Sequence, residues 1–587
     1  MAHSYVRKTP GFVQSESESM LMLETDICCI STPQQMEWLR EDPKGQYRLA
    51  ADIDMDGAAW APVDFDGILD GEGHTIRNFK IVAATAGGNQ GFFGCLGENA
   101  RVDHIHLRSV EIAGDPAATC IGVLAGVNLG HIASCSVGAD APYKPTRSGK
   151  RQILTGSCDP TVIRDPRKTG VCVGAVVGKN AGVVTDVRSY ALLETAMQGL
   201  CGENTGSVDG LWRDASNRTE LQGKTAGDMR RQIVDYMFRM GDVRWIPSKD
   251  MAFTTAYADG TNVVYAKGVP HYGLPYTQKY GPLERMNYCL GQDDYVEGWL
   301  PSYSDAGDTD PANTEPGWDI YLGNDCSGAV FWSWARCCAS VSFEFTGHMI
   351  PTPENQKEFG VLPVGNYTAR TWYSLDALAE NDANEILEGY AKLRMADAIV
   401  MRSPAHGHTR LVFRDPVVMR DENGVIDPEM SYLPTHEQGV GKGSSGRDST
   451  WQLGCRYTFA ELLKEYLPIT NKELLQGVPA PVQLWTEDLI GPMQGKVCSN
   501  YRIISTRVEL VCGEEKHSST VFATVVNKHL EDPGQGDNTA RGTVTQVDLK
   551  RHHRNLGEIP QGDYDYTVSV LLGNGTSYQV CKGQCTI

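Results

Sequence analysis

The sequence has 587 residues, a formal net charge of −20 and 41% hydrophobic residues, which is enough for several globular domains of about 100–200 residues each. The excess of acidic residues argues against nucleic-acid binding, because contacts to phosphates need a basic surface. The sequence contains no stretch of about 18 apolar residues, so no membrane-spanning helix is expected.

Cysteine usage indicates the redox state of the chain. The 17 cysteines are odd in number and include the vicinal pairs Cys28-Cys29 and Cys337-Cys338. These features favour reduced thiols over a disulfide framework. Residues 1–20 are polar and show no apolar core of a secretory signal. The sequence therefore predicts neither disulfides nor a leader.

The N-terminal region changes from polar to strand-rich. Residues 1–25 are predicted to be disordered, because they contain an alternating Ser and Glu run at 15–19. A short helix is expected at 31–39, where hydroxyl side chains precede a proline in the first turn. Alternating strands with glycine punctuation follow at 47–55 and 65–76.

A glycine-rich repeat with the spacing Gly-x-Asn-x-Gly-x-(Ile/Val) occurs within 122–132, 174–184 and 202–208. This spacing is typical of solenoid coils, in which glycines permit tight corners and asparagines form a ladder from coil to coil. The repeat resembles the GLUG motif, and the resemblance implies a right-handed parallel β-helix over 26–215. The basic, Pro-rich segment 139–168 is predicted to be a loop ejected from one coil. No cluster of carboxylates or basic residues is apparent on one face, so we expect a binding or spacing role.

Residues 216–248 are predicted to form a linker that contains a helix at 226–240. Ile233, Met237 and Met240 fall on one face of that helix, which is typical of core packing.

Two more domains are expected after the linker. The first occupies 249–490 and closes with an amphipathic helix at 457–468. The second, at 497–587, contains alternating strands and is predicted to be a β-sandwich, with strands at 502–511, 519–526 and 564–572. The fold predicted for the whole chain is therefore multidomain and mainly β, with one α+β domain.

A candidate nucleophile lies in the segment 323–334, which reads Gly-Asn-Asp-Cys-Ser-Gly and continues with small and apolar-aromatic residues. Asp325 is a good helix cap, so Cys326 is expected in the first helical turn. Free backbone N–H groups and the helix dipole at that position predict a lowered thiol pKa. The small neighbours Ser327 and Gly328 leave the sulfur approachable. The alternative is that Cys326 is one inert buried cysteine among many.

A candidate base follows on predicted strands. The segment 395–401 is strand-like, and a turn leads from it into a second strand that has His408 at its start. A third segment, 431–438, offers side chains to orient the imidazole. Gln438 or Glu437 is preferred for this role and His436 is a third possibility, because strand register decides which one faces inward.

This order of a helical Asp-Cys-Ser-Gly cysteine, a strand histidine and a polar residue on the next strand resembles the NlpC-type papain-like cysteine peptidases and the related CHAP amidases. The stretch 269–276 resembles the Gly-x-Pro-Tyr stretch that precedes the nucleophile in the family, which implies that Tyr276 lines the site. Asp397 lies where the family has Gly-Asp, with Ala396 in place of the glycine. The resemblance covers about 250–470 and implies a papain-like α+β domain.

The resemblance also implies roles for the candidate residues. Cys326 would attack an amide carbonyl, His408 would accept its proton, and Gln438 or Glu437 would orient the imidazole. Asp325 and Ser327 would contact the substrate or shape the turn beneath it. A metal pair at 406–408 is the alternative, but zinc needs three or four ordered ligands, so no metal or cofactor is expected.

Two functions remain open from the sequence. The first is a cysteine peptidase or amidase acting on peptidoglycan stem peptides, which implies an extracellular or cell-wall location, with a phage-borne or cytoplasmic setting as the alternative. The second is a solenoid adhesion or surface-assembly protein, such as part of a phage tail, whose cysteine domain is inactive or has other peptides as substrate. Homo-oligomerisation or a larger assembly is compatible with both functions.

Overall fold

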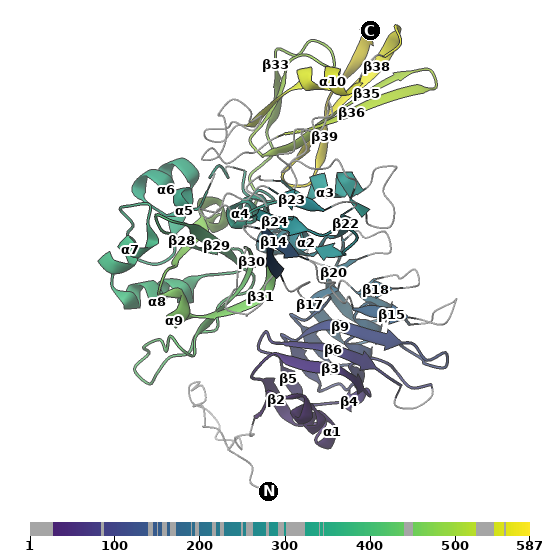
Figure 1. The fold of residues 1–587 in the computed structure, drawn as a ribbon, viewed down its shortest axis with the longest axis vertical. Coiled ribbons are helices and arrows are strands. Elements are labelled where there is room, and N and C mark those ends of the chain that lie inside the picture. The colour runs from purple at the N-terminus through teal and green to yellow at the C-terminus, as the bar shows by residue number, and fades with distance from the viewer. Residues whose placement is uncertain are drawn as a thin grey trace.

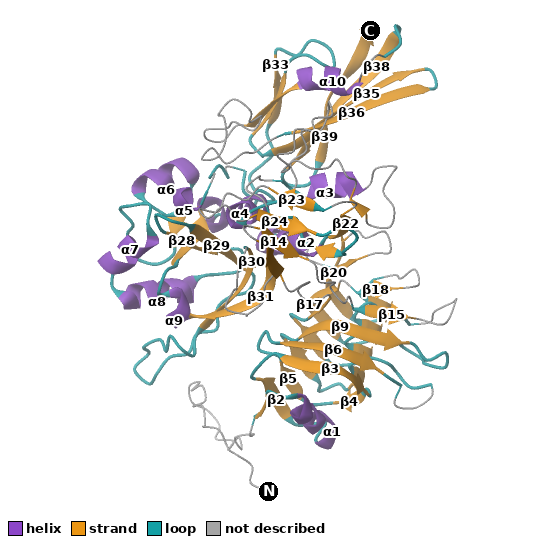
Figure 2. Ribbon diagram, viewed as in Figure 1, coloured by secondary structure: helices purple, strands orange, loops and turns teal. Residues whose placement is uncertain are grey.

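The structure is a computed structural model. It describes residues 27–83, 87–138, 145–148, 151–154, 161–164, 172–189, 191–193, 199–213, 219–223, 228–247, 250–253, 262–276, 281–290, 299–300, 323–339, 341–343, 345–439, 450–523, 545–556 and 559–587. The expected disorder at 1–25 lies outside these residues. The described part is mainly β, as predicted, with an N-terminal group of strands at one end, C-terminal sheets at the other and a mixed region between them (Figure 1 and Figure 2).

The N-terminal part is a stack of short parallel strands, which we call the parallel stack. One row consists of β1 (Cys28–Ile30), β2 (Gln46–Leu49), β5 (Ile68–Asp70), β8 (Arg101–Asp103), β11 (His131–Ala133) and β17 (Val183–Ser189). A second row consists of β4 (Val63–Phe65), β7 (Phe93–Leu96), β10 (Ala125–Asn128), β16 (Val177–Asn180) and β19 (Cys201–Asn204). A third begins with β3 (Ile53–Trp60), β6 (Thr75–Ile81) and β9 (His106–Ala113), and β9 then pairs with both β12 (Ser136–Gly138) and β15 (Val162–Arg164).

Both ends of the stack have their own elements. At the start, η1 (Pro33–Glu37) and α1 (Trp38–Glu41) form the expected helix, and Thr32 and Gln35 make a capping box. At the far end, β15 pairs with β18 (Leu192–Leu193), β17 pairs with β20 (Ser207–Arg213), and β20 turns back to pair with β21 (Thr219–Gln222) in antiparallel fashion.

The predicted asparagine ladder is confirmed. Asn128 Nδ2 donates to Asn180 Oδ1 at 2.8 Å, and Asn180 Nδ2 donates to Asn204 Oδ1 at 2.7 Å. These residues occupy the same place in the three copies of the repeat. The corner glycines are also required, because a Cβ on Gly182 would collide with the carbonyl oxygen of Gly130 in the preceding rung.

The segment 139–168, predicted to be an ejected loop, contains strands in its described part. There β13 (Pro145–Ser148) and β14 (Arg151–Leu154) form a hairpin. The second of these strands pairs in parallel with β24 (Asn262–Tyr265), which also pairs with β23 (Met251–Phe253). The loop prediction was therefore wrong. The segment contributes β13 and β14 to a sheet, and β24 and β23, about a hundred residues downstream, complete that sheet.

A six-stranded antiparallel sheet forms the middle of the molecule. Its order is β27 (Val361–Pro363), β32 (Leu467–Asn471), β28 (Ala398–Arg402), β29 (Gly407–Val412), β30 (Tyr432–Gln438) and β31 (Trp451–Thr458). The predicted strands around 395–401 and 403–413 correspond to β28 and β29. Beside the sheet lie β22 (Arg244–Pro247), β25 (His271–Tyr272), β26 (Trp299–Leu300) and α3 (Leu283–Leu290).

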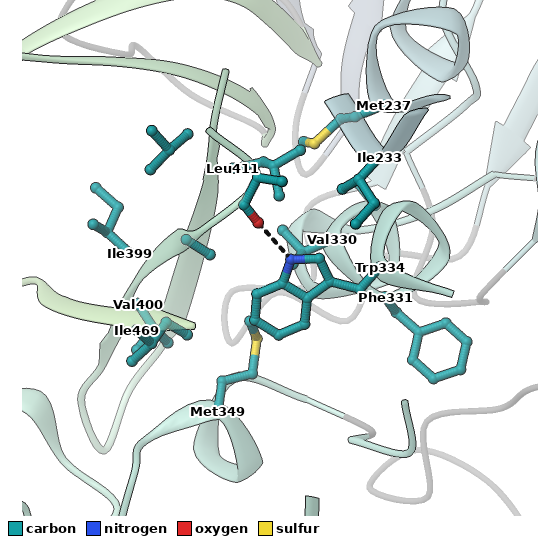
Figure 3. Close-up of a cluster of buried hydrophobic side chains, with 14 of the residues drawn as sticks. Ile233, Met237, Val330, Phe331, Trp334, Met349, Ile399, Val400, Leu411 and Ile469 are labelled. Atoms are coloured by element: carbon teal, nitrogen blue, oxygen red, sulfur yellow. Dashed lines mark hydrogen bonds between the residues drawn. The ribbon is translucent and has the colours of Figure 1, made fainter. Parts of the chain in front are cut away.

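Two helices pack against this sheet, α2 (Met229–Asp242) and α4 (Cys326–Trp334). Figure 3 shows Ile233 and Met237 of α2 and Val330 and Trp334 of α4 directed toward sheet residues such as Leu411. Trp334 Nε1 also donates to the carbonyl oxygen of Ala396 at 2.8 Å, just before β28. This bond anchors the last residue of α4 to the chain just before β28.

The other helices of this region have 4 to 10 residues each. They are α5 (Thr346–Met349), α6 (Pro353–Phe359), α7 (Ser374–Glu380), α8 (Ala383–Lys392) and α9 (Phe459–Leu462). The helix predicted at 457–468 was largely wrong, because only α9 is helical there. Its first residues end β31, and from Leu467 the chain enters β32, where Pro468 and the β-branched residues after it favour an extended backbone.

The C-terminal part contains two antiparallel sheets around a shared hydrophobic core. One has β33 (Leu484–Glu487), β34 (Lys496–Ser499) and β37 (Thr545–Asp548), and the other has β36 (Glu515–Phe522), β35 (Ile503–Cys512), β38 (Asp563–Leu572) and β39 (Ser577–Thr586). Short helices η4 (Lys472–Leu475), η5 (Leu549–Arg551) and α10 (His552–Leu556) accompany them. This part begins with β33, earlier than the predicted boundary at 497. Among the described helices, none has the length and apolar character needed to cross a bilayer.

Candidate active site

Cys326 is the first residue of α4, as the sequence predicted. Asp325 caps the helix, because its Oδ1 accepts hydrogen bonds from the backbone N–H of Gly328 at 2.7 Å and from Ser327 Oγ at 2.9 Å. Asp325 and Ser327, both expected on the substrate side, are buried and bonded to each other within this cap. The structure therefore gives them a role in holding the turn beneath Cys326.

The Cys326 sulfur lies against the backbone of β29. Its Sγ is 4.0 Å from the carbonyl oxygen of Gly407 and also accepts from the backbone N–H of Thr409. Only 6% of the residue is exposed. The sulfur thus contacts the chain on both sides of His408.

The thiol pKa differs from the prediction. Burial raises the pKa of Cys326, and the neighbouring Asp325 carboxylate raises it further. These two effects outweigh the backbone N–H groups, which lower it. Burial also raises the pKa of Asp325 to about 6. In this arrangement Cys326 is a thiol at neutral pH, so a base must remove its proton before it can attack.

His408 lies on β29 and its imidazole is held by a carboxylate. Its Nε2 is 2.5 Å from Glu437 Oε2 on the neighbouring strand β30. The ring packs over Gly439, where an added Cβ would approach His408 Cε1 to 3.0 Å. Within the described part of the chain, His408 Nδ1 makes no hydrogen bond. The imidazole also makes no hydrogen bond to the Cys326 sulfur there. One imidazole nitrogen is therefore oriented and the other is left for proton transfer.

Glu437 is a buried carboxylate with three partners. Besides His408, Arg410 Nε donates to Oε2 at 2.9 Å and the Tyr457 hydroxyl donates to Oε1. Burial alone would raise the pKa of Glu437, but the Arg410 guanidinium and the hydrogen bonds lower it to about 2. Glu437 is therefore ionised at neutral pH, and its Oε2 accepts a hydrogen bond from the N–H of His408 Nε2.

Arg410 is itself enclosed by aromatic rings. Its guanidinium carbon lies 4.0 Å from the Tyr457 ring centroid and 4.2 Å from that of Tyr466. Such contacts favour a cation over the ring faces. The Glu437 carboxylate is close enough to Cys326 to raise the pKa of the thiol, and Cys326 is close enough to Tyr466 to raise the pKa of the Tyr466 hydroxyl. The thiol and the charged cluster are thus parts of one site.

Of the other two candidates for orienting His408, neither contacts the imidazole. Gln438 Nε2 donates to the carbonyl oxygens of Leu274 at 2.8 Å and Pro275 at 3.2 Å. His436 stacks on Phe413 with ring centroids 4.3 Å apart. Successive strand residues face opposite sides, so Glu437 lies on one face of the sheet and its two neighbours lie on the other.

Tyr276 lies beside the turn that leads into α4. It forms a parallel bridge with Asn324, whose backbone N–H donates to the carbonyl oxygen of Pro275 at 3.0 Å. The backbone N–H of Tyr276 donates to the Tyr265 hydroxyl at 2.7 Å. The structure therefore brings the end of the 269–276 stretch next to the turn that leads into Cys326.

The sequence interpretation missed Arg410, Tyr457 and Tyr466. A signal for Arg410 was available, because it follows His408 by two residues on the same strand and so shares its face. The two tyrosines fell in the segment that was predicted to be a helix.

The alternative metal pair gains no further ligands in the described residues, where no group of three or more His, Cys, Asp or Glu side chains is placed to hold an ion. His406 Nδ1 instead lies 3.3 Å from Ser403 Oγ in the exposed turn between β28 and β29.

Comparisons with known proteins add little to this site. No protein-family model matches the chain. A protein of Evansella cellulosilytica described as a "putative Gly-rich membrane protein" is 34% identical over 94 residues, which is 15% of this chain. The chain spans only 11% of the length of that relative. The likeness is therefore local.

Proposed function

We propose that the chain is a cysteine peptidase or amidase of the NlpC type that hydrolyses amide bonds in peptidoglycan stem peptides. The observation that carries this proposal is the pair of His408, on the strand that touches the Cys326 thiol, and Glu437 on the neighbouring strand β30. A nucleophile at a helix start, an imidazole beside it and a buried carboxylate that orients the imidazole are the parts that acyl transfer needs.

The proposed reaction begins with proton transfer from Cys326 to His408. The thiolate attacks the amide carbonyl and forms a thioester as the amine leaves with a proton from the imidazolium. Water, deprotonated by His408, then hydrolyses the thioester. The Glu437 carboxylate stabilises the imidazolium, and the backbone N–H of Cys326 donates to the oxyanion. The raised thiol pKa makes the imidazolium and Glu437 essential to this scheme.

The proposed fold assignments follow the same interpretation. We assign the parallel stack to a right-handed β-helix of GLUG-like repeats, and the six-stranded sheet with α4 to a papain-like domain. The stack and the C-terminal sheets would hold the catalytic domain on an extracellular or cell-wall substrate. The parallel pairing and the asparagine ladder support the first assignment.

One observation favours the second function, a solenoid adhesion or assembly protein with an inactive cysteine domain. The Cys326 sulfur is buried and its pKa is raised, which are properties of inert structural cysteines.

The experiment that separates the two uses purified peptidoglycan of several wall chemotypes, with released fragments followed by mass spectrometry. The parent chain, Cys326→Ala and Cys512→Ala are compared, since Cys512 is an exposed cysteine on the C-terminal strand β35. Fragments from the parent and Cys512→Ala, but not from Cys326→Ala, support the hydrolase and identify the bond. Equal fragment release by Cys326→Ala would refute the nucleophile, and no release by any chain supports the adhesion protein.

A further inference from the structure

The parallel stack is joined to the middle of the molecule through buried ion pairs. Arg188 of β17 donates to Asp235 of α2 through Nη2 at 2.7 Å, and Arg188 Nη1 lies 3.0 Å from Asp186. Arg231 of α2 pairs with Asp186 in return. These four charged groups are almost completely buried, so they lie inside a contact between α2 and the end of the stack.

A second group of contacts joins the stack to the six-stranded sheet. The Tyr432 hydroxyl at the start of β30 donates to Glu72 at 3.1 Å, and Arg456 of β31 lies 3.5 Å from the same carboxylate. Gly454 of β31 approaches the stack as well, because an added Cβ there would lie 3.3 Å from His106 Nε2. The edge strand β31 and its neighbour β30 therefore both contact the stack.

His436 lies at the centre of this contact. Its ring stacks on Phe413 and meets Phe238 of α2 edge to face, with ring centroids 5.2 Å apart. Its Nδ1 accepts a hydrogen bond from the backbone N–H of Gly454 at 2.9 Å. The residue is 1% exposed, and Nε2 is buried without a hydrogen-bond partner in the described part of the chain.

The groups that face His436 are cationic or basic. Arg188 and His106 approach from the stack and Arg414 from the segment after β29. Burial is the largest cause of a pKa of His436 well below 6.5, and these three groups lower it further. The acidic groups on the neighbouring elements are engaged elsewhere, with Asp235 on Arg188 and Glu72 on Arg456 and Tyr432. The imidazole is therefore neutral in the packed interface.

The next residue along β30 is Glu437 of the candidate active site. The pairing of β30 with β31 shifts its register between Thr435 and His436, opposite Gly454, which has a φ of 77°. The Gly454 to His436 hydrogen bond lies at this bulge. A bulge sets which side chains of the following residues face each side of a sheet. The bond at His436 thus supports the register that directs Glu437 to His408.

We propose that His436 is a positioning residue and a proton-sensitive latch, which in its neutral form docks the parallel stack on β30 and holds Glu437 toward His408. A protonated imidazole would lose the Nδ1 acceptor and place a cation beside Arg188 and Arg414. The latch follows from the interface alone. Its consequence for catalysis rests on the proposed function.

The sign of the pH effect follows from proton binding. The folded interface excludes a proton that the open state binds with an ordinary histidine pKa near 6.5. The docked state is therefore fully favoured above about pH 6.5. Below it, the ratio of docked to open molecules falls by up to about tenfold per pH unit, until the pH reaches the folded pKa.

Variants of His436 separate protonation from packing. Asn at this position keeps an acceptor near Nδ1 but does not titrate, so His436→Asn is the conservative variant that should retain docking in acid. His436→Phe keeps the aromatic packing and removes the acceptor for Gly454. The control is His271→Asn, because burial lowers the pKa of His271 to about 3 but this residue packs on Trp245 and Tyr265, away from the stack.

Hydrogen exchange of the full-length chain from about pH 8 to about pH 5, corrected for intrinsic rates, measures the docking. We expect protection of β17, β30 and β31 to fall up to about tenfold per unit below about pH 6.5 in the parent and in His271→Asn, while β38 in the C-terminal sheets stays protected. His436→Asn should remove that dependence, and His436→Phe should lower protection at every pH.

An unchanged acid response in His436→Asn would overturn the proposal, and so would equal loss of protection in β38 and β30. Should that variant not fold, the parent decides, because pH-independent protection of β17 and β30 also overturns it. None of these readouts needs turnover. A failed latch and a failed hydrolase are therefore told apart, since the fragment-release assay tests only the latter.

Discussion

Two consecutive side chains of β30 lie buried on opposite faces of one sheet, and one of them is charged while the other is neutral. Glu437 is ionised, because Arg410, Tyr457 and His408 supply a cation and donors that compensate its burial. His436 is neutral, because the groups around it are aromatic or cationic. Burial disfavours the charged form of both side chains. The groups around each side chain therefore determine whether it is charged in the folded chain.

Removing the cation should have the largest effect on this comparison. In Arg410→Met the Glu437 carboxylate loses its main compensation, and we expect a loss of about 3–5 kcal/mol in the free energy of unfolding at neutral pH. The pKa of Glu437 is about 2 in the folded chain and 4.5 ordinarily, so this contribution is present above about pH 4.5 and is lost as the pH falls toward 2. Urea unfolding at neutral pH and about pH 3 measures it.

A double variant controls for packing in that experiment. Arg410→Met combined with Glu437→Gln removes both charges, so most of the lost stability should return. Additive losses, or a loss below about 1 kcal/mol in the single variant, would contradict the interpretation of Glu437 as a charge held by Arg410.

The second prediction compares neighbours on the two faces directly. Glu437→Gln removes the carboxylate that orients His408, and we expect kcat to fall about 10²–10⁴-fold. Gln438→Met removes hydrogen bonds to Leu274 and Pro275 instead, so it should lower stability by about 1–2 kcal/mol and change kcat little. The rate at which stem-peptide fragments are released gives kcat for both variants. Urea unfolding of the same variants gives their stability. A larger loss of kcat in Gln438→Met would reverse the assignment.

The sequence predicted those parts of the site that depend on local signals. Asp325 has the side chain of a helix cap, and α4 begins at Cys326. Alternating residues with a turn predicted β28 and β29, which carry His408 to the sulfur. The shared Asn of the glycine repeat predicted a ladder, because equivalent residues of stacked coils lie side by side.

What the sequence did not predict depends on contacts between distant segments. The sequence preferred Glu437 or Gln438 over His436 but could not choose between them, because the bulge at Gly454 sets the register of β30 against β31 and no local pattern reveals it. The lowered pKa expected for Cys326 was wrong, since burial by other elements outweighs the helix dipole. The pairing of β14 with β24 joins segments with no shared motif.

The smallest predicted effect tests the neutral donor to Glu437. Tyr457→Phe removes the hydroxyl that donates to Oε1, and we expect a loss of about 1–2 kcal/mol of stability at neutral pH. Tyr466→Phe is the matched control, because that ring also lies over Arg410 but its hydroxyl does not donate to Glu437.

Urea unfolding of the two variants at neutral pH and about pH 3 makes this comparison. The gap between them should shrink in acid, because a protonated Glu437 accepts a weaker hydrogen bond. Equal losses at both pH values would mean that Tyr457 contributes through ring packing alone, and the charged state of Glu437 would then depend on Arg410 and His408.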